Sequence, residues 1–388
     1  MSWEGAPPGP SSRRRRRFWL VAGLGVALAG AVAAVVVDGS HDRPAPLTVA
    51  STEEPVTDRA TVPGQLQPVQ GDPVAAGEIP GDGPLLPGAP ALTIVTADFG
   101  SRLQIVDVRS GGVRTVRLFT KPTFLRPDAM QVVGDSLVVD TTGDVVRLAP
   151  GARRPVVLAR DHRSIFTASA GSVWVYDGVE TLMGGVASRI GFDGTVHDRV
   201  TLPTLSQPLG GTADHLIVSA PGIVTRIDRD GSQREIARGA GLASDGTRLA
   251  RLDCVADLSC MIVIGTLDDP DGTRLALPPD ELPAGLFTEP RGRFSPDGRW
   301  LALPVYRPRH DGPVDQSGVA VIDLLVGAEV ARIDGSPLTQ PHAPLGWSPD
   351  SGWLVVSTGT TLQAWSAADR DVTELDIGLS PTYALAVW

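Results

Sequence analysis

The sequence predicts an all-β protein, a seven-bladed β-propeller, and three observations support this prediction. A strand–turn–strand pattern occurs at residues 294–303 and again at 347–356, and a hairpin that recurs roughly every 40–50 residues is typical of propeller blades. Hairpins of a second kind can be aligned from residue 92 to residue 388. No helical hydrophobic period competes with the strand pattern over this range.

The second kind of hairpin is predicted to form the outer two strands of each blade. Most of these hairpins have turn residues such as Asp-Gly at their tips, as tight β-turns require. Their strands are 103–106 with 113–118, 145–148 with 156–158, 188–192 with 196–202, 223–227 with 233–236, 261–264 with 273–277, 319–322 with 329–333, and 362–365 with 372–377.

The inner hairpins lie between the outer ones, and only six are found. Residues 383–388 are predicted to supply the missing inner strand by pairing with residues 92–95, which closes the ring and leaves no open sheet edge. Seven blades then average about 42 residues each, although six or eight blades are not excluded by this count. The six inner turns fall at 134–135, 171–172, 213–214, 245–246, 297–298 and 350–351.

One inner hairpin carries a recognisable motif. Residues 293–302 (RFSPDGRWLA) resemble the repeat of WD40-like propellers of the TolB type, and residues 346–350 and 242–246 are weaker copies. In that family the Ser-Pro-Asp-Gly segment is a turn, in which Asp caps the backbone and Gly takes a positive φ angle. The resemblance implies a propeller and no particular chemistry. Propeller-bearing hydrolases need a Gly-x-Ser-x-Gly motif, which this sequence lacks.

The N-terminus predicts the compartment. Residues 1–17 end in five arginines, and residues 18–37 form an uncharged apolar stretch that is long enough, as a helix, to cross a bilayer. The arginines hold residues 1–17 in the cytoplasm by the positive-inside rule, so the chain is expected to be a single-pass protein of a bacterial plasma membrane. A cleaved signal peptide, with its site near residues 31–33, is the alternative, and it also exports the rest of the chain.

Residues 38–91 are predicted to be a disordered tether between the membrane and the propeller of residues 92–388. They contain ten prolines and no aromatic residue, so they cannot bury enough apolar surface to fold. Lys121 is the only lysine of the chain, an Arg bias typical of GC-rich bacterial genomes such as the actinobacterial ones. The chain has a net charge of −10, and residues 1–37 carry +4, so the remaining residues carry −14. So acidic a domain lacks the basic face that nucleic acid requires, which excludes nucleic acid as a partner.

The two cysteines, Cys254 and Cys260, are predicted to form a disulfide across a short hairpin loop, provided that the domain is exported. As free thiols they could not make a zinc site without a second ligand pair. We expect no metal and no cofactor. Residues 268–272 have acidic side chains but lack the ligand spacing of a calcium loop, and the histidines are scattered.

The predicted binding residues lie on the face that bears the connections between blades. Loop 306–318 offers an aromatic ring, two cations, an imidazole and a carboxylate within six residues, a mixture that suits recognition of an anionic group or a protein surface. A solvated loop is the alternative interpretation. The residues selected are Tyr306, Arg307, Arg309, His310 and Asp311, together with His342 from a neighbouring connection.

Three functions are compatible with such a propeller. The first is a non-catalytic binding module outside the membrane, whose partner is an envelope protein or a cell-wall polymer. The alternative is an extracytoplasmic enzyme, a hydrolase or lyase, with a polar site at the propeller axis, but no catalytic residue can be selected from the sequence. The third is a sensor that holds a small ligand in an axial pocket.

Overall fold

The computed structural model describes most of the predicted propeller. The described residues belong to one compact unit, and no helix among them is long and apolar enough to cross a membrane. The predicted cytoplasmic segment, the transmembrane helix and most of the tether lie outside these residues. The described ranges are 78–97, 102–117, 125–141, 144–149, 152, 155–160, 163–169, 171–177, 184–254, 260–276, 282–283, 292–307, 315–334, 344–358, 361–375, 377, 382 and 384–388.

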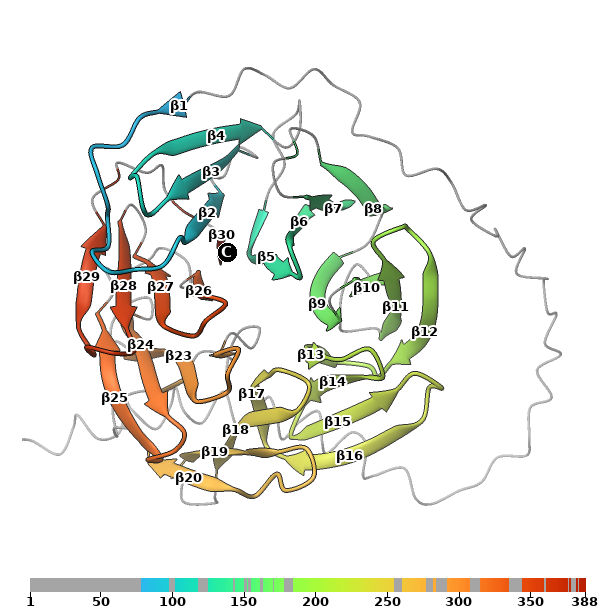
Figure 1. The fold of residues 1–388 in the computed structure, drawn as a ribbon. Helices are drawn as coiled ribbons and strands as arrows, with labels where there is room; N and C mark the ends of the chain where they lie inside the picture. Colours follow the sequence, from blue (N-terminus) through green and yellow to red (C-terminus); the bar gives the residue numbers. More distant parts are fainter. Residues whose placement is uncertain are drawn as a thin grey trace, which may run out of the picture. The chain divides into compact units, whose positions relative to one another are not determined.

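The strands form seven antiparallel sheets arranged around an axis, so the predicted seven-bladed propeller is confirmed (Figure 1). We call the strands of each blade A to D from the axis outward. Blades 1 to 3, in the order A to D, are β30 (Ala384–Val387), β2 (Thr93–Ala97), β3 (Arg102–Asp107) and β4 (Val113–Arg117); β5 (Leu125–Val133), β6 (Ser136–Thr141), β7 (Asp144–Leu148) and β8 (Val156–Arg160); and β9 (Arg163–Ser169), β10 (Ser172–Asp177), β11 (Gly185–Gly191) and β12 (Val196–Leu202).

Blades 4, 5 and 7 follow the same plan, whereas the A strand of blade 6 is interrupted. Blade 6 has two short segments, β21 (Leu282–Pro283) and β22 (Arg293–Phe294), which both pair with its B strand, β23. The strands are β13 (Gln207–Gly211), β14 (His215–Ala220), β15 (Ile223–Asp228) and β16 (Gln233–Arg238); β17 (Ala240–Ser244), β18 (Arg248–Cys254), β19 (Cys260–Thr266) and β20 (Thr273–Ala276); β23 (Trp300–Arg307), β24 (Asp315–Asp323) and β25 (Ala328–Ile333); and β26 (Leu345–Trp347), β27 (Trp353–Ser357), β28 (Leu362–Ser366) and β29 (Val372–Leu375).

The two ends of the propeller meet in blade 1, as the sequence predicts. β30 pairs with β2, with Val387 opposite Ile94 and Ala384 opposite Ala97. The A strand of every blade contacts the A strand of the next, and β30 completes the circle between β26 and β5. The ring is therefore closed by hydrogen bonds between residues nearly 300 positions apart, a separation set by the bounds of β2 and β30.

The chain joins the propeller earlier than the predicted boundary at residue 92. β1 (Glu78–Ile79) adds a fifth strand to the outer edge of blade 1, and the following residues turn back along it. The Leu85 amide donates to the Val108 carbonyl (2.9 Å), and the Leu86 side chain is buried where blade 1 meets blade 7. This segment lacks aromatic residues, the feature from which the sequence predicts a tether to residue 91, but its backbone pairs with blade 1 and Leu86 is buried there.

The core lies between blades and consists mainly of B and C strands. Leu137, Val138 and Val139 of β6 are fully buried, because a central strand is covered on both faces by neighbouring blades. Trp174, Trp300 and Trp365 are at most 2% exposed, whereas Trp353 is partly buried. The outermost strands are more exposed to solvent; in β16 (QREIAR), for example, most side chains are exposed.

The predicted disulfide is present. Cys254 ends β18 and Cys260 begins β19, and the two residues lie directly opposite each other with 4.1 Å between their Cα atoms. The bond therefore joins the B and C strands of blade 5 at the end of the hairpin.

Candidate functional site

The predicted binding loop extends from two long strands of blade 6. The backbone of β23 continues through Tyr306 to Arg307, which pairs with Asp315 of β24. The side chains of Tyr306 and Arg307, and the whole of Arg309, His310, Asp311 and His342, lie outside what the structure describes. Their role as binding residues therefore stays a prediction.

Many polar contacts among the described residues lie on the face of the propeller opposite to loop 306–318. We call it the turn face, because it holds the A–B and C–D turns of the blades. Three A–B turns with an Asp at the same position follow one another in blades 5, 6 and 7. These are Asp245, Asp297 and Asp350, and each accepts a hydrogen bond from the backbone N–H two residues ahead. The motif thus acts as a turn, as the resemblance implied.

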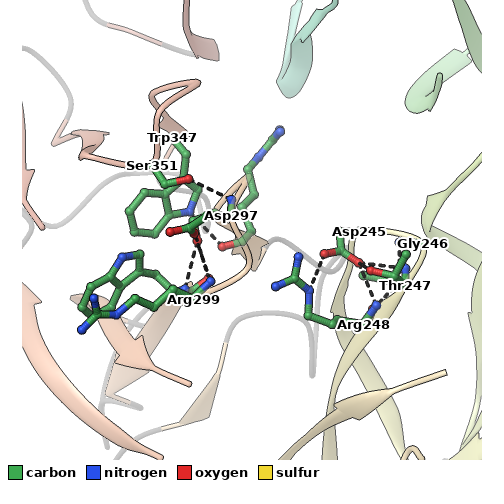
Figure 2. Close-up of polar contacts among 12 residues, drawn as sticks. Asp245, Gly246, Thr247, Arg248, Asp297, Arg299, Trp347 and Ser351 are labelled. Atoms are coloured by element: carbon green, nitrogen blue, oxygen red, sulfur yellow. Dashed lines mark hydrogen bonds and ion pairs between the residues drawn. The ribbon is translucent and has the colours of Figure 1, made fainter. Parts of the chain in front are cut away.

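In blade 5, Asp245 also fixes an arginine (Figure 2). Its Oδ1 accepts from the amides of Thr247 (2.8 Å) and Arg248 (2.7 Å), and its Oδ2 accepts from Arg248 Nε (2.7 Å). The Arg248 guanidinium reaches blade 6, where it lies 5.5 Å from the centre of the Phe294 ring. One carboxylate therefore holds both the turn and the direction of an arginine side chain.

In blade 6, Asp297 is held by the motif and by the next blade. Ser295 Oγ (2.6 Å) and the Arg299 amide (3.0 Å) donate to its Oδ1, and its own amide donates to Ser351 Oγ of blade 7 (2.9 Å; Figure 2). Burial raises the pKa of Asp297, but the hydrogen bonds from Ser295 and Arg299 outweigh burial and bring its pKa below the ordinary value. The ionised carboxylate is thus the stable form in the folded ring.

Ser351 occupies the position that is glycine in the two other turns, and its backbone is strained. Its φ is 62°, in the left-handed region that disfavours side chains, and it is 3% exposed. A glycine at this position would avoid the strain, but it would lack the hydroxyl that accepts the hydrogen bond from the Asp297 amide across the blade boundary.

We expect Ser351→Ala to destabilise the protein by about 1–2 kcal/mol, since it keeps the strained φ and leaves the Asp297 amide without an acceptor. Ser351→Gly relieves the strain while losing the same bond, so it should cost less, about 0–1 kcal/mol. Urea denaturation of both variants measures the difference. Equal losses would mean that the backbone strain contributes nothing.

Similar contacts join other blades on this face. His215 Nε2 of blade 4 lies 2.7 Å from the Gly246 carbonyl of blade 5, and Trp174 Nε1 of blade 3 donates to the Thr212 carbonyl of blade 4 (2.7 Å). Trp347 Nε1 of blade 7 donates to the Arg293 carbonyl of blade 6 (3.0 Å). Side chains near the turns thus link blades 3 to 7 into one continuous face.

A buried carboxylate, Asp323, ends β24 beneath this face. Its side chain is inaccessible to solvent, and it lies 3.1 Å from Arg299 Nη2 and 3.9 Å from Arg370 Nη2 of blade 7. The Leu325 amide donates to its Oδ1 (3.0 Å). Burial raises the pKa of Asp323, but the hydrogen bonds from Arg299 and Leu325 lower it more, so its pKa lies below the ordinary value.

Asp323 should therefore contribute to acid sensitivity. Because its pKa is lowered on folding, its contribution is complete above the unfolded-state pKa of about 4 and is lost as the pH falls through the lower folded-state pKa. We expect Asp323→Asn to cost about 1–2 kcal/mol at pH 7, since both arginines are half-exposed and stay solvated. Urea denaturation between pH 7 and pH 3 should show that the free energy of unfolding of Asp323→Asn varies less with pH than that of the wild type.

Glu374→Gln, which removes the same charge at an exposed position, is the control. If the free energy of unfolding of Asp323→Asn varies with pH as steeply as that of the wild type, the role assigned to Asp323 is wrong.

A cleft of about 260 Å³ opens between blades 5 and 6 on the turn face. Its apolar lining comes from Ile264 and Leu275 of blade 5 and Leu324 of blade 6, and Arg248 and Thr273 add polar groups. Among the described residues, no group of three or more His, Cys, Asp or Glu side chains could hold a metal ion. The cleft, with its apolar lining and an arginine, is a candidate site for a small molecule in the described part of the chain.

Sequence reasoning missed this cleft. The turns at residues 245–246 and 297–298 are predicted from the sequence as turns alone, but Gly298 lines the cleft and Asp245 holds Arg248, which lines it too. The spacing of Arg248, three residues after Asp245, could have indicated an ion pair at the turn. Only the stacking of blade 5 on blade 6 places this arginine at a cleft.

No protein-family model matches the sequence, and no curated protein matches it. Solved structures resemble the fold. Apo AztD from Citrobacter koseri aligns with a TM-score of 0.45 and 13% identity, over 77% of this chain and 98% of that one. A functionally unknown protein from Desulfotomaculum acetoxidans gives 0.46 and 12%, over 76% and 98%. Dihydro-heme d1 dehydrogenase NirN in complex with DHE gives 0.46 and 15%, over 80% and 79%. The likeness concerns the fold and carries no function to this chain.

Proposed function

We propose that this chain is a non-catalytic binding module of the bacterial cell envelope, in which the helix of residues 18–37 holds the propeller outside the plasma membrane. The Cys254–Cys260 disulfide carries the proposal, because disulfides persist in oxidising compartments and are rare in the cytosol. The five arginines before the apolar stretch support the same orientation. The partner is an envelope protein or a cell-wall polymer, bound on the face that carries loop 306–318.

The compartment can be tested through the two cysteines. Membranes from cells that express the full chain are treated with a maleimide that adds mass, with and without prior reduction. We expect labelling only after reduction, and a protein that alkaline carbonate does not extract. A variant without residues 18–37 is the control, and it should stay in the cytoplasm with both thiols labelled directly. Free thiols in the full chain, or its extraction by carbonate, would contradict the proposal.

The partner can be tested by photo-crosslinking in intact cells. A photoreactive amino acid replaces Tyr306 on the binding face, and a second variant carries it at Val196, as the control. Val196 is exposed and follows the C–D turn of blade 3, so it lies on the opposite face. We expect one envelope protein, or material sensitive to wall-degrading enzymes, to be joined through position 306 and not through position 196. Identical products from both positions, or none from either, would contradict a partner on this face.

A further inference from the structure

We propose that the cleft between blades 5 and 6 binds a carboxylate carried on an apolar group. The cleft opens on the turn face, at the ends of the strands opposite to loop 306–318. The inference therefore goes beyond the proposed function and does not depend on where the chain resides. Four features of the cleft support it: a fixed arginine, a glycine that gives the arginine room, an apolar lining, and the hydroxyl group of Thr273.

The arginine is Arg248, and its position is set before any ligand arrives. Asp245 accepts a hydrogen bond from its Nε (Figure 2). The guanidinium lies over the Phe294 ring of blade 6. Its side chain is 25% exposed. Among the described residues, neither terminal amino group has a hydrogen-bond partner. A planar guanidinium that is held at Nε offers its two Nη groups, which match the two oxygens of a carboxylate.

Gly298 makes room for this arginine. It has a φ of +72°, and the Arg248 guanidinium lies where a Cβ atom on residue 298 would be. The glycine of the Asp-Gly turn therefore has a second role besides its positive φ, because any side chain there would displace Arg248 from the wall of the cleft.

The remaining lining matches a small ligand with an apolar part. Ile264, Leu275 and Leu324 supply aliphatic surface, and the hydroxyl of Thr273 lies on the blade 5 side. Such a combination of an apolar wall with few polar groups is typical of small-molecule sites. Asp269 is exposed at the same cleft and opposes a multivalent anion more strongly than a single carboxylate, so inorganic phosphate should bind poorly.

This chemistry has two sources, a free carboxylic acid and the C-terminus of a peptide. The probes are therefore N-acetyl-leucine and a hexapeptide that ends in leucine, each compared with its C-terminal amide, and inorganic phosphate. Titration calorimetry of the purified full chain in detergent measures binding. We expect at least one carboxylate to bind with a dissociation constant in the millimolar range or below, and its amide at least tenfold more weakly. Binding of the peptide alone would identify a chain terminus as the ligand, and binding of N-acetyl-leucine would identify a free acid.

Two variants locate the binding. Arg248→Gln should weaken carboxylate binding at least tenfold, whereas Arg226→Gln should leave it unchanged. Arg226 is the matched control because it makes a similar ion pair, with Asp228 (2.6 Å), at a similar exposure on blade 4. Thr273→Phe, an exposed change on β20, fills the cleft without replacing Arg248 or Asp245, and it should abolish binding even if Arg248→Gln fails to fold.

Three results would overturn the inference: no binding of either carboxylate at 50 mM or so, equal binding of acid and amide, or undiminished binding by Thr273→Phe. None of these bears on the compartment, which the cysteine labelling tests separately.

Discussion

Deletion of residues 384–388 is expected to abolish cooperative folding of the propeller. β30 supplies the A strand of blade 1, and its four residues are at most 4% exposed. Without them β2 has an open edge, and the paired bonds between Thr93 and Trp388 are lost (2.8 Å each). Burial of a Leu or Val side chain contributes about 1.5–3 kcal/mol, so Leu385 and Val387 together contribute about 3–6 kcal/mol. With the lost hydrogen bonds of the edge strand, this reaches the lower part of the total stability of about 5–15 kcal/mol.

The matched control acts on the other edge of the same blade. Replacing Glu78 and Ile79 by glycine removes β1, which pairs through only two residues and leaves Ile79 64% exposed. This change should lower stability by about 1 kcal/mol or less. Circular dichroism during urea denaturation of both full-length variants makes the comparison. If the truncated chain still unfolds in one sharp transition, then ring closure by β30 is not needed for folding.

Trp365→Ala is expected to cost about 3–5 kcal/mol, the largest effect of any single substitution considered for this chain. The Trp365 side chain is fully buried in blade 7. Its ring meets Trp300 of blade 6 at 5.2 Å and Trp347 at 6.1 Å between centroids, both edge to face. The substitution leaves a large cavity between two blades and removes both aromatic contacts.

Two further variants show where this loss comes from. Trp365 Nε1 is buried without a hydrogen-bond partner in the described structure, so Trp365→Phe removes an unsatisfied group and should cost only about 1–2 kcal/mol. Trp353→Ala, at a partly exposed tryptophan of the same blade, is the control and should cost less than Trp365→Ala. Urea denaturation measures all three. Equal losses at positions 365 and 353 would mean that the inter-blade cluster contributes no special stability.

The contacts between turns explain why the turn face is a rigid place for a site. Asp245 holds Arg248, and Arg248 faces the turn at residues 297–298. Ser351 of blade 7 fixes that turn by accepting a hydrogen bond from the Asp297 amide. A ligand that binds Arg248 therefore meets a side chain whose conformational entropy is already reduced, and such preorganisation favours affinity.

The hairpins, the ring closure and the disulfide could all be predicted from the sequence. Each of these depends on a local signal: alternating apolar residues, Asp-Gly turns, an unpaired strand at each end of the chain, and two cysteines that flank one loop. These signals can be read locally because successive side chains of a β-strand point to opposite faces of the sheet. The alternation of apolar and polar residues in a strand therefore indicates which face is buried.

Only the tertiary structure decided what happens between blades. The sequence gives no sign that Ser351 accepts a hydrogen bond from Asp297, that Arg248 takes the space beside Gly298, or that Leu86 packs where blades 1 and 7 meet. These contacts join residues from different hairpins, and their geometry depends on how one twisted sheet stacks on the next. Hydrophobic periodicity carries no information about that stacking, and for this reason the cleft could not be found before the blades were in place.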